Sequence, residues 1–227
     1  MAPRKRPASA AVSCVKRRAQ GGGIPVSGKP IFVCATGAGG GRSRQVILSE
    51  FGDTHFFAFD GRPNLTKPHL EEPFLMQFVS EAWKASKLFG ARRPLYLAGH
   101  SFGSRVAVHL LTSAECRDKL PGNFRGVVAF GYPLVHPTQK REEKLLAMPP
   151  GIPLLFISGT RDSFMGDFSL LERTLAKATC GRNSIVAKVE GGDHGLACAA
   201  RLEELAVKTV RDSLVGFLRM GTKSQKC

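Results

Sequence analysis

The sequence contains no apolar stretch that approaches the ~20 consecutive residues that a membrane-spanning helix requires. Its longest apolar runs have about the length of a buried strand, and no apolar signal-peptide core stands at its start. No internal repeat is visible. These absences exclude a membrane-spanning protein and a repeat array, and they predict a soluble globular protein.

Cysteine pairs that could form a disulfide framework or a metal site are also missing. The six cysteines are scattered without paired or metal-ligand spacing. The histidines form no such spacing with Cys, Asp or Glu either. The sequence therefore predicts free thiols in a reducing compartment, with no metal ion and no bound cofactor.

Acidic residues are absent from the start of the chain, and the first one is Glu50. The first twenty positions instead carry six basic residues, namely Arg4, Lys5, Arg6, Lys16, Arg17 and Arg18. Such a segment cannot bury apolar surface. We therefore predict a disordered basic tail and glycine-rich hinge over residues 1–28.

The two basic clusters of this tail are separated by nine residues, which is typical of a bipartite nuclear-import signal. This interpretation predicts an import receptor as a partner and a location in the nucleus or cytoplasm. An acid-free leader with Arg and Ser is also typical of an organellar transit peptide. A plain solubilising tail is the third alternative.

The rest of the sequence contains enough apolar material for one core. Hydrophobic residues make up 43% of the chain, which indicates a single domain at 29–220 before a short polar C-terminal tail at 221–227. Apolar runs alternate with segments of helical periodicity, which predicts a mostly parallel sheet with helices on both faces. We expect strands at 30–35, 55–59, 94–98, 126–130, 153–158 and 184–190, and helices near 46–51, 74–89, 102–111, 167–178 and 199–218.

The third expected strand leads into Gly99-His100-Ser101-Phe102-Gly103 and then into a helical pattern. A serine at the apex of such a turn is forced toward a positive φ, which holds its hydroxyl out toward a substrate. Gly99 and Gly103 have no side chains that would clash as the strand and the helix close on each other. We interpret the segment as a nucleophile elbow with Ser101 as the nucleophile.

A serine nucleophile needs a base, and the base needs an acid that orients it. Asp162 follows the fifth expected strand and His194 follows the sixth. The chain order is then Ser, acid, His, with each residue after a strand. We therefore expect His194 to be the base and Asp162 to orient it.

Other titratable residues offer weaker alternatives. Asp60 and Asp167 could each replace Asp162 as the orienting acid. His100 is adjacent to the nucleophile and is expected to pack locally rather than act as the base. Asp193 precedes His194 directly, so we expect it to cap its own loop.

A glycine-rich loop, Thr-Gly-Ala-Gly-Gly-Gly at 36–41, follows the first expected strand. In a hydrolase such a loop brings a backbone N–H to the carbonyl oxygen of the substrate, beside the N–H of the residue after the serine. We favour an oxyanion hole formed by Ala38 and Phe102. A dinucleotide-binding fingerprint formed by two of the glycines and Asp60 is the alternative, although its spacing is met only loosely.

Together, the loop centred on Ala38 and the motifs at 99–103, 159–162 and 191–194 resemble the α/β-hydrolase superfamily over almost the whole of residues 29–220. The stretch Phe-Gly-Tyr-Pro-Leu at 130–134 supports a narrower placement. There the chain looks most like the small, lidless dienelactone-hydrolase-like branch. That branch includes the testis-expressed hydrolase-like proteins and the hydrolase-like domain of subunit 3 of the NSL histone-acetyltransferase complex.

This resemblance implies an α/β-hydrolase fold without a substantial lid domain, because only about twenty residues separate the fourth and fifth expected strands. It also implies a small-molecule acyl substrate. The sequence departs from the oxyanion loop His-Gly-Ala-Gly-Gly of many relatives, because Thr36 stands where that His would be. The branch includes members that are regarded as interaction domains.

The sequence thus predicts a serine esterase or thioesterase that uses Ser101, Asp162 and His194. The alternative is a catalytically silent hydrolase fold that serves as an interaction module in the nucleus. A formal net charge of +15 raises the question of nucleic-acid binding. No stacking-aromatic motif accompanies the basic residues, so only nonspecific attraction is expected.

Overall fold

A sheet of six parallel strands forms the centre of the protein in this computed structural model, which describes residues 27–38, 43–61, 64–136 and 139–223. The strand order in the sheet is β2-β1-β3-β4-β5-β6. The strands are β1 Ile31–Ala35, β2 Asp53–Phe57, β3 Leu95–His100, β4 Phe124–Phe130, β5 Leu154–Gly159 and β6 Ser184–Val189. The predicted parallel α/β architecture is confirmed. Nearly all of the predicted tail and hinge lies outside the described residues.

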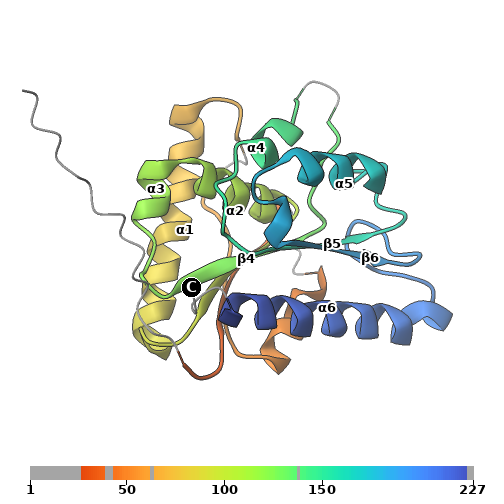
Figure 1. Cartoon of the computed structure of the whole chain (residues 1–227), viewed down its shortest axis with the longest axis horizontal. Helices are drawn as coiled ribbons and strands as arrows, with labels where there is room; N and C mark the ends of the chain where they lie inside the picture. Colours follow the sequence, from red (N-terminus) through yellow and green to blue (C-terminus); the bar gives the residue numbers. More distant parts are fainter. Residues whose placement is uncertain (1–26, 39–42, 62–63, 137–138, 224–227) are drawn as a thin grey trace, which may run out of the picture.

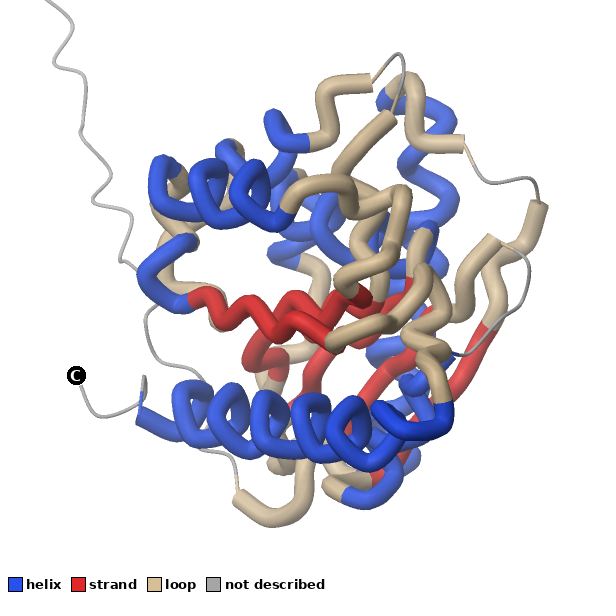
Figure 2. Tube along the Cα trace, turned by 90° about the vertical axis from the view of Figure 1, so that its right-hand side faces the viewer, coloured by secondary structure: helices blue, strands red, loops and turns tan. Residues whose placement is uncertain are grey.

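Helices cover both faces of the sheet (Figures 1 and 2). One face carries α1 Pro68–Phe89, α2 Phe102–Thr112, α3 Ala114–Asp118, α4 Glu142–Leu146 and α5 Phe168–Lys177. The opposite face carries η1 Ser43–Glu50 and α6 Glu203–Lys223. Two short turns of 3-10 helix, η2 Gly181–Asn183 and η3 Ala200–Leu202, precede β6 and α6.

The strand β1 shows how the sequence divides its apolar residues between two cores. Ile31, Val33 and Ala35 pack in the core beneath α1 and α2. Phe32 and Cys34 pack in the other core, with α6 and η1. Because side chains alternate across a strand, a continuous apolar run is what a parallel strand buried on both faces requires.

The helix boundaries depart from the predicted ones at three places. Residues 43–50 form a 3-10 helix, and α6 continues to Lys223 instead of ending near 218. The helix α1 begins at Pro68, six residues before the predicted start at 74. Proline favours the first helical position because it needs no hydrogen-bond acceptor there, and the helix also tolerates Pro73 in its second turn.

The described cysteines, Cys34, Cys116, Cys180 and Cys198, are all free. Burial raises the pKa of the Cys34 thiol, so it stays protonated as part of the core. No helix in the described ranges is long and apolar enough to cross a membrane.

The order of the strands singles out one position at the carboxyl ends of the strands. The chain order reverses between β1 and β3, which are neighbours in the sheet. In open parallel sheets, ligands bind outside the carboxyl ends of the strands at such a reversal point. The loop that begins at Thr36 follows β1, and Ser101 follows β3, so both leave the sheet at this reversal point.

Candidate active site

Ser101 occupies the sharp turn between β3 and α2 that its motif predicts. Its backbone angles are φ 51° and ψ −110°, which a residue with a side chain rarely adopts. Its N–H donates to the carbonyl oxygen of Phe130 on the neighbouring strand at 3.0 Å. The side chain is half-buried. The strained backbone therefore leaves the hydroxyl within reach of solvent.

The two glycines of the pentapeptide are required by close backbone contacts. A Cβ atom at Gly99 would lie 2.3 Å from the carbonyl carbon of Gly103. A Cβ atom at Gly103 would lie 2.7 Å from the carbonyl oxygen of Ala35, at the end of β1. Any larger residue would separate α2 from β3 or from β1, and this would move Ser101.

We expect Gly99→Ala to lower the free energy of unfolding by about 3 kcal/mol, because the contact to Gly103 involves backbone atoms that cannot move aside. Gly216→Ala in α6 is the matched control. There the new methyl group would lie 3.8 Å from Ile185, so helix propensity should leave stability unchanged or raise it. Urea unfolding of both variants measures the effect. Equal stability of the two variants would contradict it.

His194 and Asp162 meet across the end of the sheet. His194 Nδ1 lies 2.9 Å from Asp162 Oδ2 and 3.0 Å from Oδ1. The Asp162 side chain is fully buried, and it also accepts a hydrogen bond from the N–H of Phe164 at 2.9 Å. The carboxylate thus fixes the ring with Nδ1 as the donor, which leaves Nε2 as the acceptor. Within the described residues Nε2 makes no hydrogen bond.

The loops that carry these two residues are joined by backbone contacts. Thr160 Oγ1 accepts a hydrogen bond from Gly191 N at 2.8 Å, and Arg161 N donates to Gly192 O at 2.8 Å. A Cβ atom at Gly159 would lie only 2.0 Å from Gly192 O. The two glycine-containing motifs therefore allow the loops to approach closely enough for Asp162 to reach His194.

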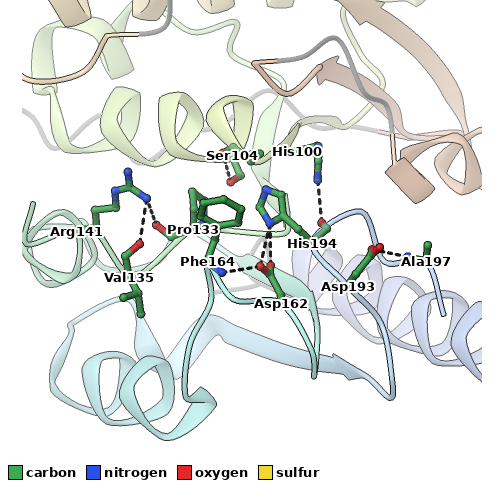
Figure 3. A network of polar contacts seen from close by, with 11 residues as sticks. His100, Ser104, Pro133, Val135, Arg141, Asp162, Phe164, Asp193, His194 and Ala197 are labelled. Atoms are coloured by element: carbon green, nitrogen blue, oxygen red, sulfur yellow. Dashed lines mark hydrogen bonds and ion pairs between the residues drawn. The ribbon is translucent and has the colours of Figure 1, made fainter. Parts of the chain in front are cut away.

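His194 is also held from its other side. Its carbonyl oxygen lies 3.0 Å from His100 Nε2, at the end of β3. Figure 3 shows the imidazole of His194 between Asp162 and the first turn of α2, where Ser104 is labelled. The ring of Phe164 lies 4.7 Å from the ring of His194, centroid to centroid. His100 thus has the local packing role that the sequence predicts, and it connects the elbow strand to the histidine loop.

The predicted oxyanion loop lies beside the same turn, although its glycines 39–41 are outside the described residues. A Cβ atom at Gly37 would lie 2.9 Å from His100 Nδ1, so the loop packs directly against the end of β3. Thr36 is buried, and its Oγ1 has no hydrogen-bond partner in the described part of the chain. Ala38 is an exposed turn residue.

Phe102 is the first residue of α2, so its N–H is one of the four that lack an intrahelical partner. Its side chain is anchored by two edge-to-face contacts. The ring centroids of Phe59 and Phe74 lie 5.5 Å and 5.2 Å from that of Phe102. This aromatic packing fixes the N-terminus of α2, where a developing negative charge would be stabilised.

The alternative acids lie elsewhere. Asp60 is exposed after β2, and Asp167 caps the N-terminus of α5 through Ser169 N at 2.8 Å. Asp193 accepts from Ala197 N at 2.9 Å, which is the predicted loop-capping role. The loop after β1 leads into a 3-10 helix rather than the α-helix that a dinucleotide pyrophosphate would need.

The sequence analysis did not single out three residues in the neighbourhood of Ser101 and His194. Phe164 is 51% exposed although its ring packs on His194, so an apolar face stands open next to the imidazole. Arg105 on α2 and Arg141 before α4 are both buried. A signal for Arg105 was present, since it lies four residues after Ser101 in an otherwise apolar helix.

Comparisons with known proteins agree with this architecture. A family model described as an alpha/beta hydrolase domain matches residues 61–215, which is more than half of the chain. Among curated proteins no relative matches.

Solved structures share the fold at low sequence identity. An esterase from Thermogutta terrifontis aligns over 89% of this chain and 85% of its own, at 16% identity and a TM-score of 0.57. A dienelactone hydrolase from Anabaena variabilis aligns over 86% and 89%, at 15% identity and a TM-score of 0.53. An alpha-beta serine hydrolase homologue from Coxiella burnetii aligns over 83% and 86%, at 14% identity and a TM-score of 0.56.

Proposed function

The chain belongs to the alpha/beta hydrolase domain family, and from that premise we propose that it is a serine hydrolase that transfers the acyl group of an ester or thioester to water. One observation carries the proposal. The buried carboxylate of Asp162 holds the imidazole of His194 at the same edge of the sheet where a strained turn presents Ser101. Hydrolases and esterases among the solved structures of this fold support it.

In the first half of the reaction, the Oγ of Ser101 attacks the substrate carbonyl carbon while Nε2 of His194 takes the hydroxyl proton. The carbonyl oxygen becomes an oxyanion, stabilised by the N–H groups of Phe102 and Ala38. Asp162 stabilises the imidazolium that has formed. The leaving alcohol or thiol then departs with the proton from His194, and the acyl group remains on Ser101.

In the second half, His194 takes a proton from a water molecule as that water attacks the acyl-enzyme carbonyl carbon. The tetrahedral intermediate collapses, the acid leaves, and the proton returns from His194 to the Oγ of Ser101. The burial of Asp162 matters in both halves, because its charge interacts with the imidazolium in surroundings of low dielectric.

The segment between β4 and β5 supports a small substrate. It contains α4, which has only five residues, and no other helix or strand in its described part. A substantial lid that could enclose a long acyl chain is therefore missing from this segment. The open ring of Phe164 beside His194 is the apolar surface against which a short acyl group would pack.

The proposal is tested by treating the full chain with a fluorophosphonate probe and mapping the adduct by mass spectrometry. We expect a single stable adduct, on the peptide that contains Ser101. Absence of any adduct, with the protein folded, would instead favour the catalytically silent interaction module. The narrower likeness to the testis-expressed proteins and to NSL complex subunit 3 stays a prediction, and it is compatible with either result.

We also propose that the basic tail directs the protein to the nucleus through an import receptor. Deleting residues 1–20 should leave the melting temperature and any esterase activity unchanged, because ordering this tail would cost ~1–2 kcal/mol per residue without burial to offset it. A fluorescent fusion without the tail should lose nuclear enrichment over cytoplasm. Substituting only Lys16, Arg17 and Arg18 should have much of the same effect.

Two results would contradict this role for the tail. Unchanged nuclear enrichment of the deletion variant would show that the clusters are not read as an import signal. A mature N-terminus near Gly21, found on protein inside an organelle, would establish a transit peptide instead.

A further inference from the structure

Two buried arginines lie beside the proposed active site without a carboxylate partner. Arg105 and Arg141 are each only 9% exposed. Within the described residues, neither guanidinium forms an ion pair. Buried charges in proteins are normally paired, because an unpaired charge loses its hydration without compensation. The described residues therefore do not neutralise the charge of these two guanidinium groups through an ion pair.

Both guanidinium groups converge on one neutral oxygen. Gln139 Oε1 lies 3.2 Å from Arg105 Nη2 and 3.3 Å from Arg141 Nε. The Arg105 side chain makes no other hydrogen bond in the described part of the chain, and its buried Nε has no partner there. The amide oxygen of Gln139 stands where an anionic oxygen would be held more strongly.

The nearby groups do not neutralise the pair. Glu71 is the acid that acts on Arg105 electrostatically, but its Oε2 lies 3.4 Å from Lys144 Nζ and 3.2 Å from His109 Nδ1. Tyr132 is buried, and burial raises its pKa to about 12, so it stays a neutral phenol. Burial and the charge of Arg105 lower the pKa of Arg141 to about 10, which leaves Arg141 charged at neutral pH.

Arg105 lies on the same helix as the turn that carries Ser101. The backbone N–H of Arg105 donates to the carbonyl oxygen of Ser101 at 3.2 Å, one helical turn along α2. Arg105 is therefore one turn of helix from Ser101, and side chains on a helix lean toward its N-terminus. One turn of helix spans ~5.4 Å, which is the scale of a short acyl chain.

Arg141 is connected to the histidine side of the same site. Its Nη1 donates to the carbonyl oxygens of Pro133 at 2.7 Å and Val135 at 3.5 Å. Val135 N in turn donates to Phe164 O at 2.9 Å, and the ring of Phe164 packs on His194. Figure 3 shows Arg141, Pro133 and Val135 on the side of Phe164 that is away from His194.

We propose that Arg105 and Arg141 bind an anionic group of the substrate, so that the site acts on small esters or thioesters that carry a carboxylate or phosphate a few bonds from the scissile carbonyl. In this arrangement an oxygen of the substrate's carboxylate or phosphate replaces Gln139 Oε1. It accepts hydrogen bonds from N–H groups of both guanidinium groups. Gln139 is half-buried and Lys140 is exposed, so the pair lies close beneath the surface. The preference for anionic esters rests on the proposed hydrolase function, whereas the binding of an anion by the two arginines does not.

The kinetic test compares matched anionic and neutral esters. The first pair is the 4-nitrophenyl half-ester of glutarate against 4-nitrophenyl pentanoate, and the second is 4-acetoxybenzoate against phenyl acetate. We expect kcat/KM to favour the anionic member of at least one pair. In Arg105→Gln the ratio of kcat/KM for the anionic ester to kcat/KM for the neutral ester should fall about 10- to 100-fold. Arg105→Lys should keep part of this preference. Arg173→Gln, an exposed arginine on α5, should change nothing.

Binding of the anion alone is measured by isothermal titration calorimetry of the full chain with glutarate and with phosphate, in a buffer free of other oxyanions. We expect wild type to bind at least one of them and Arg105→Gln to bind neither. The melting temperature of Arg105→Gln should be unchanged or higher, because a buried charge with one neutral partner has been removed.

The two experiments separate the two proposals. If no ester is cleaved but glutarate or phosphate binds in an Arg105-dependent way, the hydrolase proposal fails and the anion site stands. If esters are cleaved without preference for the anionic member of either pair, or with a preference that survives in Arg105→Gln, the anion site is overturned. Failure of both anions to bind wild type also overturns it.

Discussion

Ser101→Ala is expected to abolish labelling by a fluorophosphonate and to lower kcat for any ester by a factor on the order of 10⁴ or more. The change removes one half-buried oxygen, which leaves no cavity in the core, so the melting temperature should stay within a few degrees of wild type. Gel fluorescence of the labelled protein, steady-state kinetics with an ester and a thermal melt measure the three quantities.

Ser113→Ala is the matched control for this loss. Ser113 lies at the opposite end of the same helix, α2, and caps α3 through Cys116 N at 3.3 Å. Its loss should cost about 1 kcal/mol of stability and leave labelling intact. Equal labelling of Ser101→Ala and wild type would contradict the assignment of the nucleophile and with it the serine-hydrolase proposal.

His194→Ala should have the second large effect, a loss in kcat on the order of 10³ or more, because nothing else at the site can take the serine proton. The ring is 25% exposed and bonded through Nδ1 to Asp162. Its removal leaves a buried carboxylate whose one remaining donor among the described residues is the N–H of Phe164. A lower melting temperature should therefore accompany the loss of activity. Steady-state kinetics and the rate of fluorophosphonate labelling measure the catalytic part.

The variant His100→Ala tests whether His100 is the base or only holds the loop that carries His194. His100 Nε2 contacts the carbonyl oxygen of His194 at 3.0 Å, and the centroids of the two rings lie 5.0 Å apart. Removing it should lower kcat far less, through a looser histidine loop. A larger loss for His100→Ala than for His194→Ala would reverse the assignment of the base.

The local features of the fold were readable from the sequence because they depend on residues close together in the chain. Continuous apolar runs predict strands buried on both faces, as β1 shows with its residues divided between two cores. The Gly-x-Ser-x-Gly spacing predicts a positive φ at Ser101, and the structure gives 51°. The beginning of α1 was not readable, since Pro68 and Pro73 favour loops as often as first helical turns.

The sequence favoured Asp162 over Asp60 and Asp167 by its place after a strand and by the order of the motifs. It did not show the contact between Asp162 and His194. The packing of the loops after β5 and β6 produces this contact. Gly159, Gly191 and Gly192 let the loops approach until Asp162 lies 2.9 Å from His194. Those contacts join residues about thirty positions apart in the chain.

The sequence by itself determined the parallel α/β architecture and the strained turn at Ser101, since each follows from periodicity or from short spacing. Only the tertiary structure shows that Asp162 contacts His194 and that Arg105 and Arg141 share Gln139 as a partner. Arg105 and Arg141 are 36 positions apart and meet at Gln139 only because α2 packs against the segment that precedes α4. Burial removes the water that would otherwise screen their charges, and burial is a property of the packed chain.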